Sequence, residues 1–210
     1  MPGSSKKPLP EVATLAYELH GNCYLNITFR CTLRCAFCPK YNGEWEVQGY
    51  DLRLPGDPAI ADVVAAVGDP ARYNEVVFCG LGEPTRRLDA LMEIARELRA
   101  RGAKRIRVNT DGLANLVHGR NVAPELAAVV DAVSISLSAQ DEFTYVRHTR
   151  PRRAGAFEAV LEFAAGARDA GIAVTLTTID GLEGVDVAAC ERIARDLGVE
   201  FRRRVLDVVG

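Results

Sequence analysis

Short apolar segments and longer amphipathic segments alternate along this chain. A short run of apolar residues, continuous or alternating with polar ones, is typical of a strand, whereas apolar positions three and four residues apart are typical of a helix. Because the two kinds of segment follow each other at the spacing of βα units, the pattern predicts a parallel α/β sheet. The expected strands lie at 23–29, 75–79, 104–110, 132–137, 172–178 and 200–206, and the expected helices at 58–67, 88–101, 124–130, 154–170 and 185–197.

One face of several expected strands carries small polar residues. A parallel strand covered on both faces is normally apolar on both, yet here serine, threonine or asparagine alternates with the apolar side chains. This favours a curved, incomplete barrel with helices on one face and a polar ligand on the other, although propensity alone does not distinguish it from a doubly wound sheet. The polar positions are Asn26, Thr28, Ser134, Ser136, Thr175 and Thr177.

Length and composition fit one globular domain. The 210 residues suffice for one hydrophobic core. No internal linker divides them, so we expect a single domain at 21–210 after an N-terminal tail at 1–20, whose residues 1–8 are a loose segment. Hydrophobic residues make up 48% of the chain, which excludes a mainly disordered protein.

Charge and hydropathy limit the cellular location and the binding partners that we expect. A net charge of −2 gives no case for binding nucleic acid or an anionic membrane. No apolar run approaches the roughly 20 residues that a membrane helix needs, and no apolar stretch follows the basic first residues as in a signal peptide. We therefore expect a cytoplasmic protein with no membrane partner.

Six cysteines in a chain without a secretion signal predict metal or redox chemistry rather than structural disulfides. Three of them, Cys31, Cys35 and Cys38, follow the first expected strand with the spacing C-x3-C-x2-C. Three thiolates can hold three irons of a cubane cluster and leave the fourth iron without a protein ligand, an open position comparable to that of a catalytic zinc. An electron-carrier ferredoxin closes its cluster with four cysteines. Two alternatives stay open: a zinc site completed by a remote ligand, and cysteines that bind nothing.

The cysteine segment, in which Phe37 precedes the third cysteine, resembles the C-x3-C-x-aromatic-C signature of the radical S-adenosylmethionine (SAM) superfamily. The resemblance extends from the first expected strand to the sixth and implies a partial (β/α)6 barrel similar to a TIM barrel. Segments 24–28, 77–85 and 116–121, with the pair Arg150-Pro151, more closely resemble the TatD-associated radical SAM proteins.

This resemblance implies two cofactors, a [4Fe-4S] cluster on the three cysteines and SAM chelated by the open iron. It also implies a mechanism in which one electron from the reduced cluster breaks the sulfur–C5′ bond of SAM. The resulting 5′-deoxyadenosyl radical then abstracts hydrogen from a substrate. The implied partners are a one-electron donor such as flavodoxin or ferredoxin and a small-molecule or protein substrate.

The residues expected to bind SAM follow from the same resemblance. The turn after the second strand resembles the Gly-Gly-Glu motif that contacts the SAM amino group, with Leu81 in place of one glycine. The end of the third strand resembles a Thr-Asn-Gly turn, with Asp111 in place of asparagine, and the fourth strand lies near the ribose in relatives. Residues 176–179 match the adenine motif of the fifth strand poorly. The predicted cofactor-binding residues are Phe37, Gly80, Gly82, Glu83, Asn109, Thr110, Ser134 and Ser136.

Arginines are dense after the fourth expected strand and on the sixth. Arginine pairs bidentately with carboxylates and phosphates, so these positions predict an anionic substrate or a contact with the SAM carboxylate. We select Arg147, Arg150 and Arg203 as candidate substrate residues. The alternative is that such side chains pair with nearby acids, among them Asp141, Glu142 and Glu200.

Three functions remain in competition. The first is a radical SAM enzyme acting on a small molecule or a side chain. The second is an activase that installs a glycyl radical on a partner enzyme, and the third is a non-catalytic module that binds a cluster or zinc. Iron and sulfide analysis, together with SAM-dependent release of 5′-deoxyadenosine, separates the third from the first two.

Overall fold

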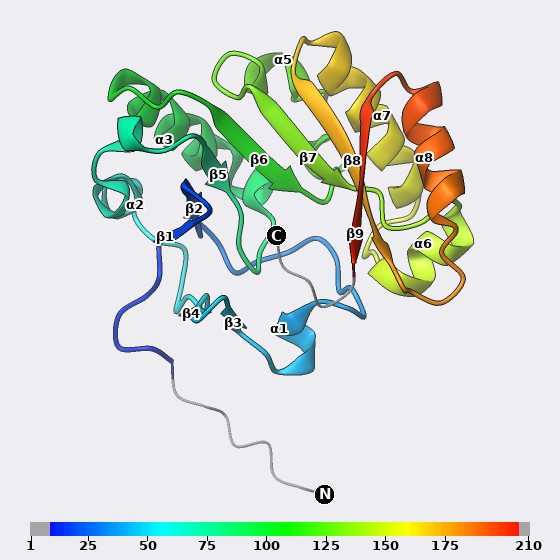
Figure 1. Cartoon of the computed structure of the whole chain (residues 1–210), viewed down its shortest axis with the longest axis horizontal. Helices are drawn as coiled ribbons and strands as arrows, with labels where there is room; N and C mark the ends of the chain where they lie inside the picture. Colours follow the sequence, from blue (N-terminus) through cyan, green and yellow to red (C-terminus); the bar gives the residue numbers. More distant parts are fainter. Residues whose placement is uncertain (1–8, 206–210) are drawn as a thin grey trace, which may run out of the picture.

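A seven-stranded sheet organises the chain, which the computed structural model describes from residue 9 to residue 205. Six strands of this sheet pair in parallel, as the pattern predicts, and the seventh pairs in antiparallel orientation at one edge (Figure 1). In spatial order the strands are β1 (Ala16–Leu19), β2 (Asn22–Leu25), β5 (Val76–Phe78), β6 (Ile106–Thr110), β7 (Ala132–Ser136), β8 (Ala173–Asp180) and β9 (Glu200–Val205).

The first strand corrects the predicted N-terminal boundary. Residues 16–19 belong to the sheet and not to a tail that ends at residue 20. Both His20 and Gly21 have positive φ, as in the tight hairpin turns that suit twisted strands, and the Tyr17 ring stacks on the Tyr24 ring at 5.4 Å. The predicted loose segment at 1–8 and the last residue of the strand predicted at 200–206 lie outside the described residues.

Most of the helices cover one face of the sheet (Figure 1). Their apolar sides pack on the alternate strand residues in one continuous core, which includes Phe78, Ile106 and Ile135 from strands and Leu91 and Phe163 from helices. No helix among residues 9–205 is long and apolar enough to cross a membrane. The helices are α1 (Pro39–Asn42), α2 (Ile60–Val67), α3 (Leu88–Ala100), α4 (Ala114–His118), α5 (Ala123–Leu126), α6 (Glu142–Thr149), α7 (Ala156–Asp169) and α8 (Val187–Asp196), and a hairpin of β3 (Glu46–Val47) and β4 (Tyr50–Asp51) follows α1.

The other side of the sheet is polar, as the sequence predicts. Strand register places Asn109 beside Ser134, Ser134 beside Thr175, and Ser136 beside Thr177, so their side chains share one surface. We call this surface the polar face.

Candidate functional site

The three clustered cysteines lie in a loop that leaves the carboxyl end of β2 and that we call the cysteine loop, Cys31–Cys38. The start of this segment is fixed by side chains from elsewhere in the chain. Thr28 Oγ1 donates to Asp57 Oδ1 at 2.7 Å, Arg30 forms an ion pair with Asp57, and Arg87 donates to the carbonyl of Ile27 at 2.7 Å. The path of the backbone into the loop is therefore determined by the fold around it.

The middle of the cysteine loop is tied to the carboxyl end of α6. The amide of Arg34 donates to the carbonyl of Thr149 at 3.0 Å, and the amide of Ala36 donates to that of His148 at 2.8 Å. Carbonyls of a last helical turn have no partner within the helix, so the loop amides satisfy them. Loop and helix end thus hold each other in place.

The thiols of the cysteine loop are partly buried and form no disulfide. The last of them stands at a sharp local turn, where the amide of Cys38 donates to the carbonyl of Cys35 at 3.1 Å and α1 begins at the next residue. Burial, together with Asp111 and Glu83, raises the pKa of Cys31 to about 12. Burial and the two neighbouring cysteines raise the pKa of Cys35. These thiols ionise when a bound cation offsets that cost, which is how iron–thiolate sites form.

No three His, Cys, Asp or Glu side chains within residues 9–205 converge as the ligands of a single metal ion do. A single zinc ion requires all its ligands within about 2.0–2.3 Å of one centre. A cubane cluster has no such requirement, because each thiolate binds a different iron. The arrangement of the three cysteines fits the cluster by donor type and by their place in one loop.

The predicted glycine turn after β5 packs directly on the segment that leads into the cysteine loop. A Cβ atom on Gly82 would lie 2.1 Å from the carbonyl oxygen of Thr28, and one on Gly80 would lie 2.5 Å from Asn26 Oδ1. The amide of Glu83 also donates to the carbonyl of Arg30 at 2.8 Å. Gly82 is therefore required by packing against backbone, and Gly80 by packing against the Asn26 side chain, whatever ligand the turn holds.

The Glu83 carboxylate points into the protein. It accepts hydrogen bonds from the amide and hydroxyl of Thr85 at 2.9 and 2.7 Å, from Thr110 Oγ1 at 2.9 Å and from the amide of Asp111 at 2.7 Å. Burial raises the pKa of Glu83, and these hydrogen bonds counteract the shift. The structure thus brings the predicted residues Glu83 and Thr110 together, from the carboxyl ends of two adjacent strands.

Asp111 is the site residue that the sequence prediction missed. Its side chain is 7% exposed, Oδ1 accepts from the amide of Leu113 at 3.0 Å, and Oδ2 has no hydrogen-bond partner among the described residues. Burial and the adjacent Glu83 raise the pKa of Asp111 well above its ordinary value. The sequence feature that could have marked Asp111 is its place in the turn after the third expected strand, where an acidic residue stands in place of asparagine.

The remaining predicted SAM contacts are spread over the polar face and the loop. Asn109 accepts a hydrogen bond from Arg107 and approaches Cys79 Sγ with its amide nitrogen at 3.4 Å. Ser134 is buried and Ser136 is half-buried on β7, and Phe37 is half-buried beside Cys38.

The predicted substrate arginines do not form one site. Arg147 lies on the surface and pairs with Glu183 at 2.7 Å, which agrees with the alternative of pairing with an acid. Arg150 is exposed and ends α6 with a φ of 47°. The choice of Arg203 is wrong, because it pairs in register with Thr178 on the helix-covered side and forms an ion pair with Asp180. Its neighbours Arg202 and Arg204 lie on the polar face instead.

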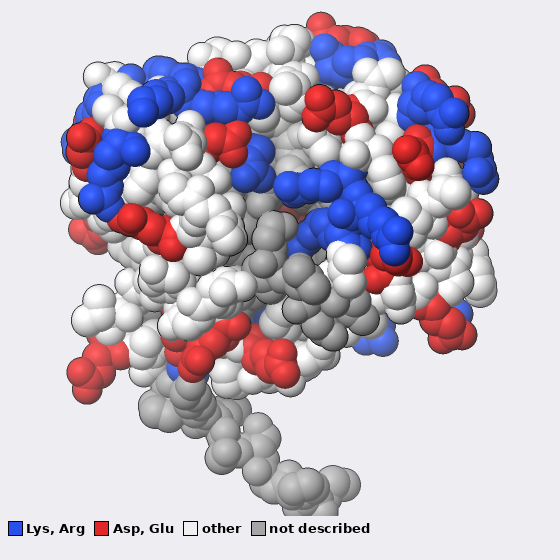
Figure 2. Space-filling model, viewed as in Figure 1, with Lys and Arg blue, Asp and Glu red and all other residues white. Residues whose placement is uncertain are grey.

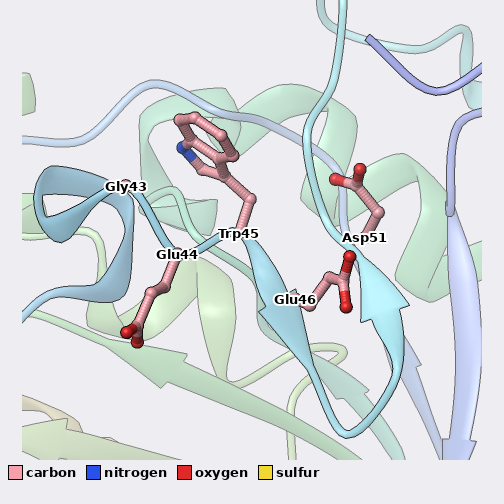
Figure 3. A pocket seen from close by; sticks show the side chains of 5 residues that line it. All are labelled: Gly43, Glu44, Trp45, Glu46 and Asp51. Carbon is pink, nitrogen blue, oxygen red and sulfur yellow. The ribbon is translucent and has the colours of Figure 1, made fainter. Parts of the chain in front are cut away.

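A hollow of about 320 Å³ lies over the β3–β4 hairpin and is lined by Gly43, Glu44, Trp45, Glu46 and Asp51 (Figure 3). Glu44 points away from Trp45 in this view. The indole already stacks with the Arg53 guanidinium at 4.9 Å, and Arg53 Nε donates to Asp51 Oδ1 at 2.9 Å. These contacts hold the residues of the β3–β4 hairpin, which follows α1, in a folded arrangement.

Comparison with known proteins gives a family and a fold. The family model described as Radical SAM superfamily matches residues 25–197. A GTP 3′,8-cyclase of Mycobacterium ulcerans is 28% identical over 201 residues, which cover 87% of this chain and 53% of that protein. The chain thus spans about half the length of the curated relative.

Two solved structures have the same fold at low identity. The structure of TYW1 with a lysine-pyruvate adduct bound matches 90% of this chain and 66% of that chain at 15% identity, with a TM-score of 0.63. Streptococcus suis SuiB bound to S-adenosylmethionine matches 89% of this chain and 38% of that one at 16% identity, with a TM-score of 0.62. These matches confirm the predicted α/β partial barrel.

Proposed function

The chain belongs to the radical SAM superfamily, whose enzymes use a [4Fe-4S] cluster and S-adenosylmethionine, and we propose that Cys31, Cys35 and Cys38 are the protein ligands of that cluster. The observation that carries this proposal is the cysteine loop, with three free thiols on one segment held at its start and in its middle. Three thiolates leave one iron open to the methionine end of SAM.

When bound, the two cofactors supply a one-electron cleavage of the sulfonium that yields a hydrogen-abstracting radical. The electron comes from a carrier protein such as flavodoxin or ferredoxin. The part played by this chain is to hold the cysteine loop on α6 and Asp57, to bury the thiols, and to present polar groups at the carboxyl ends of the strands.

We assign the SAM ammonium group to the buried carboxylates beside the loop. Glu83 accepts four hydrogen bonds from the protein and so positions the turn. Asp111 Oδ2 is buried near Thr32 without a hydrogen-bond partner among residues 9–205, so a cation that reaches it would supply the missing interaction. Asn109, Ser134 and Ser136 offer hydrogen-bonding groups on the polar face for the ribose.

Anaerobic reconstitution with iron and sulfide tests the cluster assignment. We expect about four irons per chain with the wild type, and loss of most iron and visible absorbance in Cys35→Ala. The matched control is Cys190→Ala, because Cys190 is a free cysteine buried in α8, outside the loop. A Cys35→Ala protein that kept the iron content of Cys190→Ala would overturn the assignment.

The same holoenzyme tests the activity. With dithionite and SAM, we expect release of 5′-deoxyadenosine, and its absence from a protein that carries four irons would identify a non-catalytic module. An activase would transfer the radical to a partner enzyme, so addition of a small substrate would leave the turnover unchanged.

Two more specific assignments, one of the subgroup and one of the substrate, rest on different observations. The segments at 77–85 and 116–121 support the TatD-associated subgroup. The identity to a GTP 3′,8-cyclase supports GTP as a second candidate substrate. Incubation of the reduced holoenzyme with SAM and GTP separates the two, because only a cyclase consumes GTP and gives a product of different chromatographic retention.

A further inference from the structure

Two arginines of β9 lie on the polar face. Strand register places Arg202 beside Thr177, which is itself beside Ser136, and places Arg204 beside Ile179. Arg107 of β6 lies on the same face, two residues before Asn109. Figure 2 shows Lys and Arg side chains gathered over β9 on this side of the molecule.

The arginines of this group outnumber the acids near them. Strand register places one acid, Glu200, beside Thr175 on the same face, where it accepts a hydrogen bond from the Thr175 hydroxyl at 3.3 Å. Arg107 Nε pairs with Glu75 at 3.0 Å, and the same carboxylate also pairs with Arg105 at 2.8 Å. Neither Arg202 nor Arg204 forms an ion pair within residues 9–205. Burial lowers the pKa of Arg202, as do the charges of Arg107 and Arg204, whereas the Glu75 carboxylate counteracts part of the shift.

Arg204 has a second unmet requirement. Its Nε atom is buried and has no hydrogen-bond partner in the described part of the chain. A buried donor without an acceptor is unfavourable, as are like charges that share a surface with too few counter-ions. The neighbouring Arg203 lacks neither a hydrogen-bond acceptor nor a counter-ion, because it is exposed and paired with Asp180.

An oxyanion would satisfy both requirements. The planar guanidinium fork matches the oxygens of a carboxylate or phosphate, and the Ser136 and Thr177 hydroxyls beside Arg202 can hydrogen-bond the adjoining part of a ligand. Arg204 lies near the carboxyl end of β9, and the cysteine loop follows the carboxyl end of β2 in the same sheet.

We propose that Arg202 and Arg204, with Arg107, bind a carboxylate or phosphate group of the substrate on the polar face. This inference rests on the proposed function in taking the ligand to be the substrate. The anion site itself is argued from the charges of the three arginines and from the buried, unpartnered Nε of Arg204, while Arg202 is exposed.

The test measures anion binding to the reconstituted holoenzyme by calorimetry, with pyrophosphate and citrate as the phosphate and carboxylate probes. The test variant is Arg202→Gln/Arg204→Gln, and the matched control is Arg203→Gln, which removes a charge from the same strand on the opposite side. We expect at least one probe to bind the wild type and Arg203→Gln equally, and to bind the double variant at least tenfold more weakly. Equal affinity in all three proteins, or no binding of either probe to the wild type, would overturn the proposal.

Two further measurements identify the source of the anion. If SAM binds the double variant within twofold of the wild-type affinity, the site serves the substrate, whereas a tenfold loss would assign it to the SAM carboxylate and overturn the substrate role. Iron content and thermal unfolding confirm that the double variant folds, and Arg202→Lys/Arg204→Lys provides a charge-conserving variant if it does not. Failure of the wild type to bind four irons, with anion binding intact, would refute the proposed function and not the anion site.

Discussion

Replacement of Gly82 by alanine tests how tightly the glycine turn is packed against the segment that leads into the cysteine loop. The new Cβ would lie 2.1 Å from the carbonyl oxygen of Thr28, 2.8 Å from its carbonyl carbon and 2.9 Å from the carbonyl oxygen of Arg30. All three are backbone atoms, so no side-chain rotation relieves the overlap. The two segments must separate, and the hydrogen bond from the Glu83 amide to Arg30 lengthens with them.

The expected cost combines two effects. Forced overpacking costs about 1–3 kcal/mol, and weakening one buried hydrogen bond costs about 0.5–1.5 kcal/mol. The total of about 2–4 kcal/mol corresponds to a fall in Tm of roughly 5–15 °C for a chain of this size. Because the displaced segment leads directly into the cysteine loop, the variant should also retain less iron after reconstitution.

The assay is thermal unfolding by circular dichroism on the apoprotein, with iron analysis of the reconstituted protein. Gly56→Ala is the matched control, because a Cβ at that position meets no atom within 4 Å, and we expect it to unfold within about 0.5 kcal/mol of the wild type. A Gly82→Ala protein with the Tm and iron content of Gly56→Ala would refute the packing argument.

Three further changes probe the carboxylates around the loop. Asp111 has a raised pKa in the folded protein, so the folded state binds more protons than the unfolded state, and the protein loses stability as pH rises above the unfolded pKa. The variant Asp111→Asn should not show this loss. Urea unfolding of both apoproteins between pH 4 and 8 measures the difference. Thr85→Val removes a hydroxyl that donates to buried Glu83 and should lower the free energy of unfolding by about 1–3 kcal/mol, whereas an unchanged urea midpoint would contradict that hydrogen bond. Asp57→Ala removes the acceptor of Thr28 and should speed iron release to a chelator, with the unfolding curve as the control for global damage.

Local sequence features marked the cysteine loop and predicted the longest helices. The cysteine spacing lies within one segment, and α3 follows the expected range closely because its apolar residues recur every three or four positions until Gly102. The helix α6 was missed for the opposite reason. Its apolar Phe143 is 80% exposed while the polar Thr144 is buried, so its hydrophobic pattern points to the wrong side.

Other features of the site depend on contacts between distant segments. The pairing of β5 with β6 brings Asp111 next to Glu83, although neither residue carries a local mark of the other. The choice of Arg203 failed because three consecutive arginines give no alternation of character. Only the register with β8 decides that Arg202 and Arg204 face the polar side.

The bonds between the cysteine loop and α6 have a consequence for the order in which the protein matures. All three cysteines lie in the first fifth of the chain, whereas the carbonyls of His148 and Thr149 that hold their loop come more than a hundred residues later. Contacts between such distant segments form late, because the chain between them must first be ordered. A ribosome therefore releases the thiols well before it releases their support, and stable capture of iron belongs to the finished fold rather than to the growing chain.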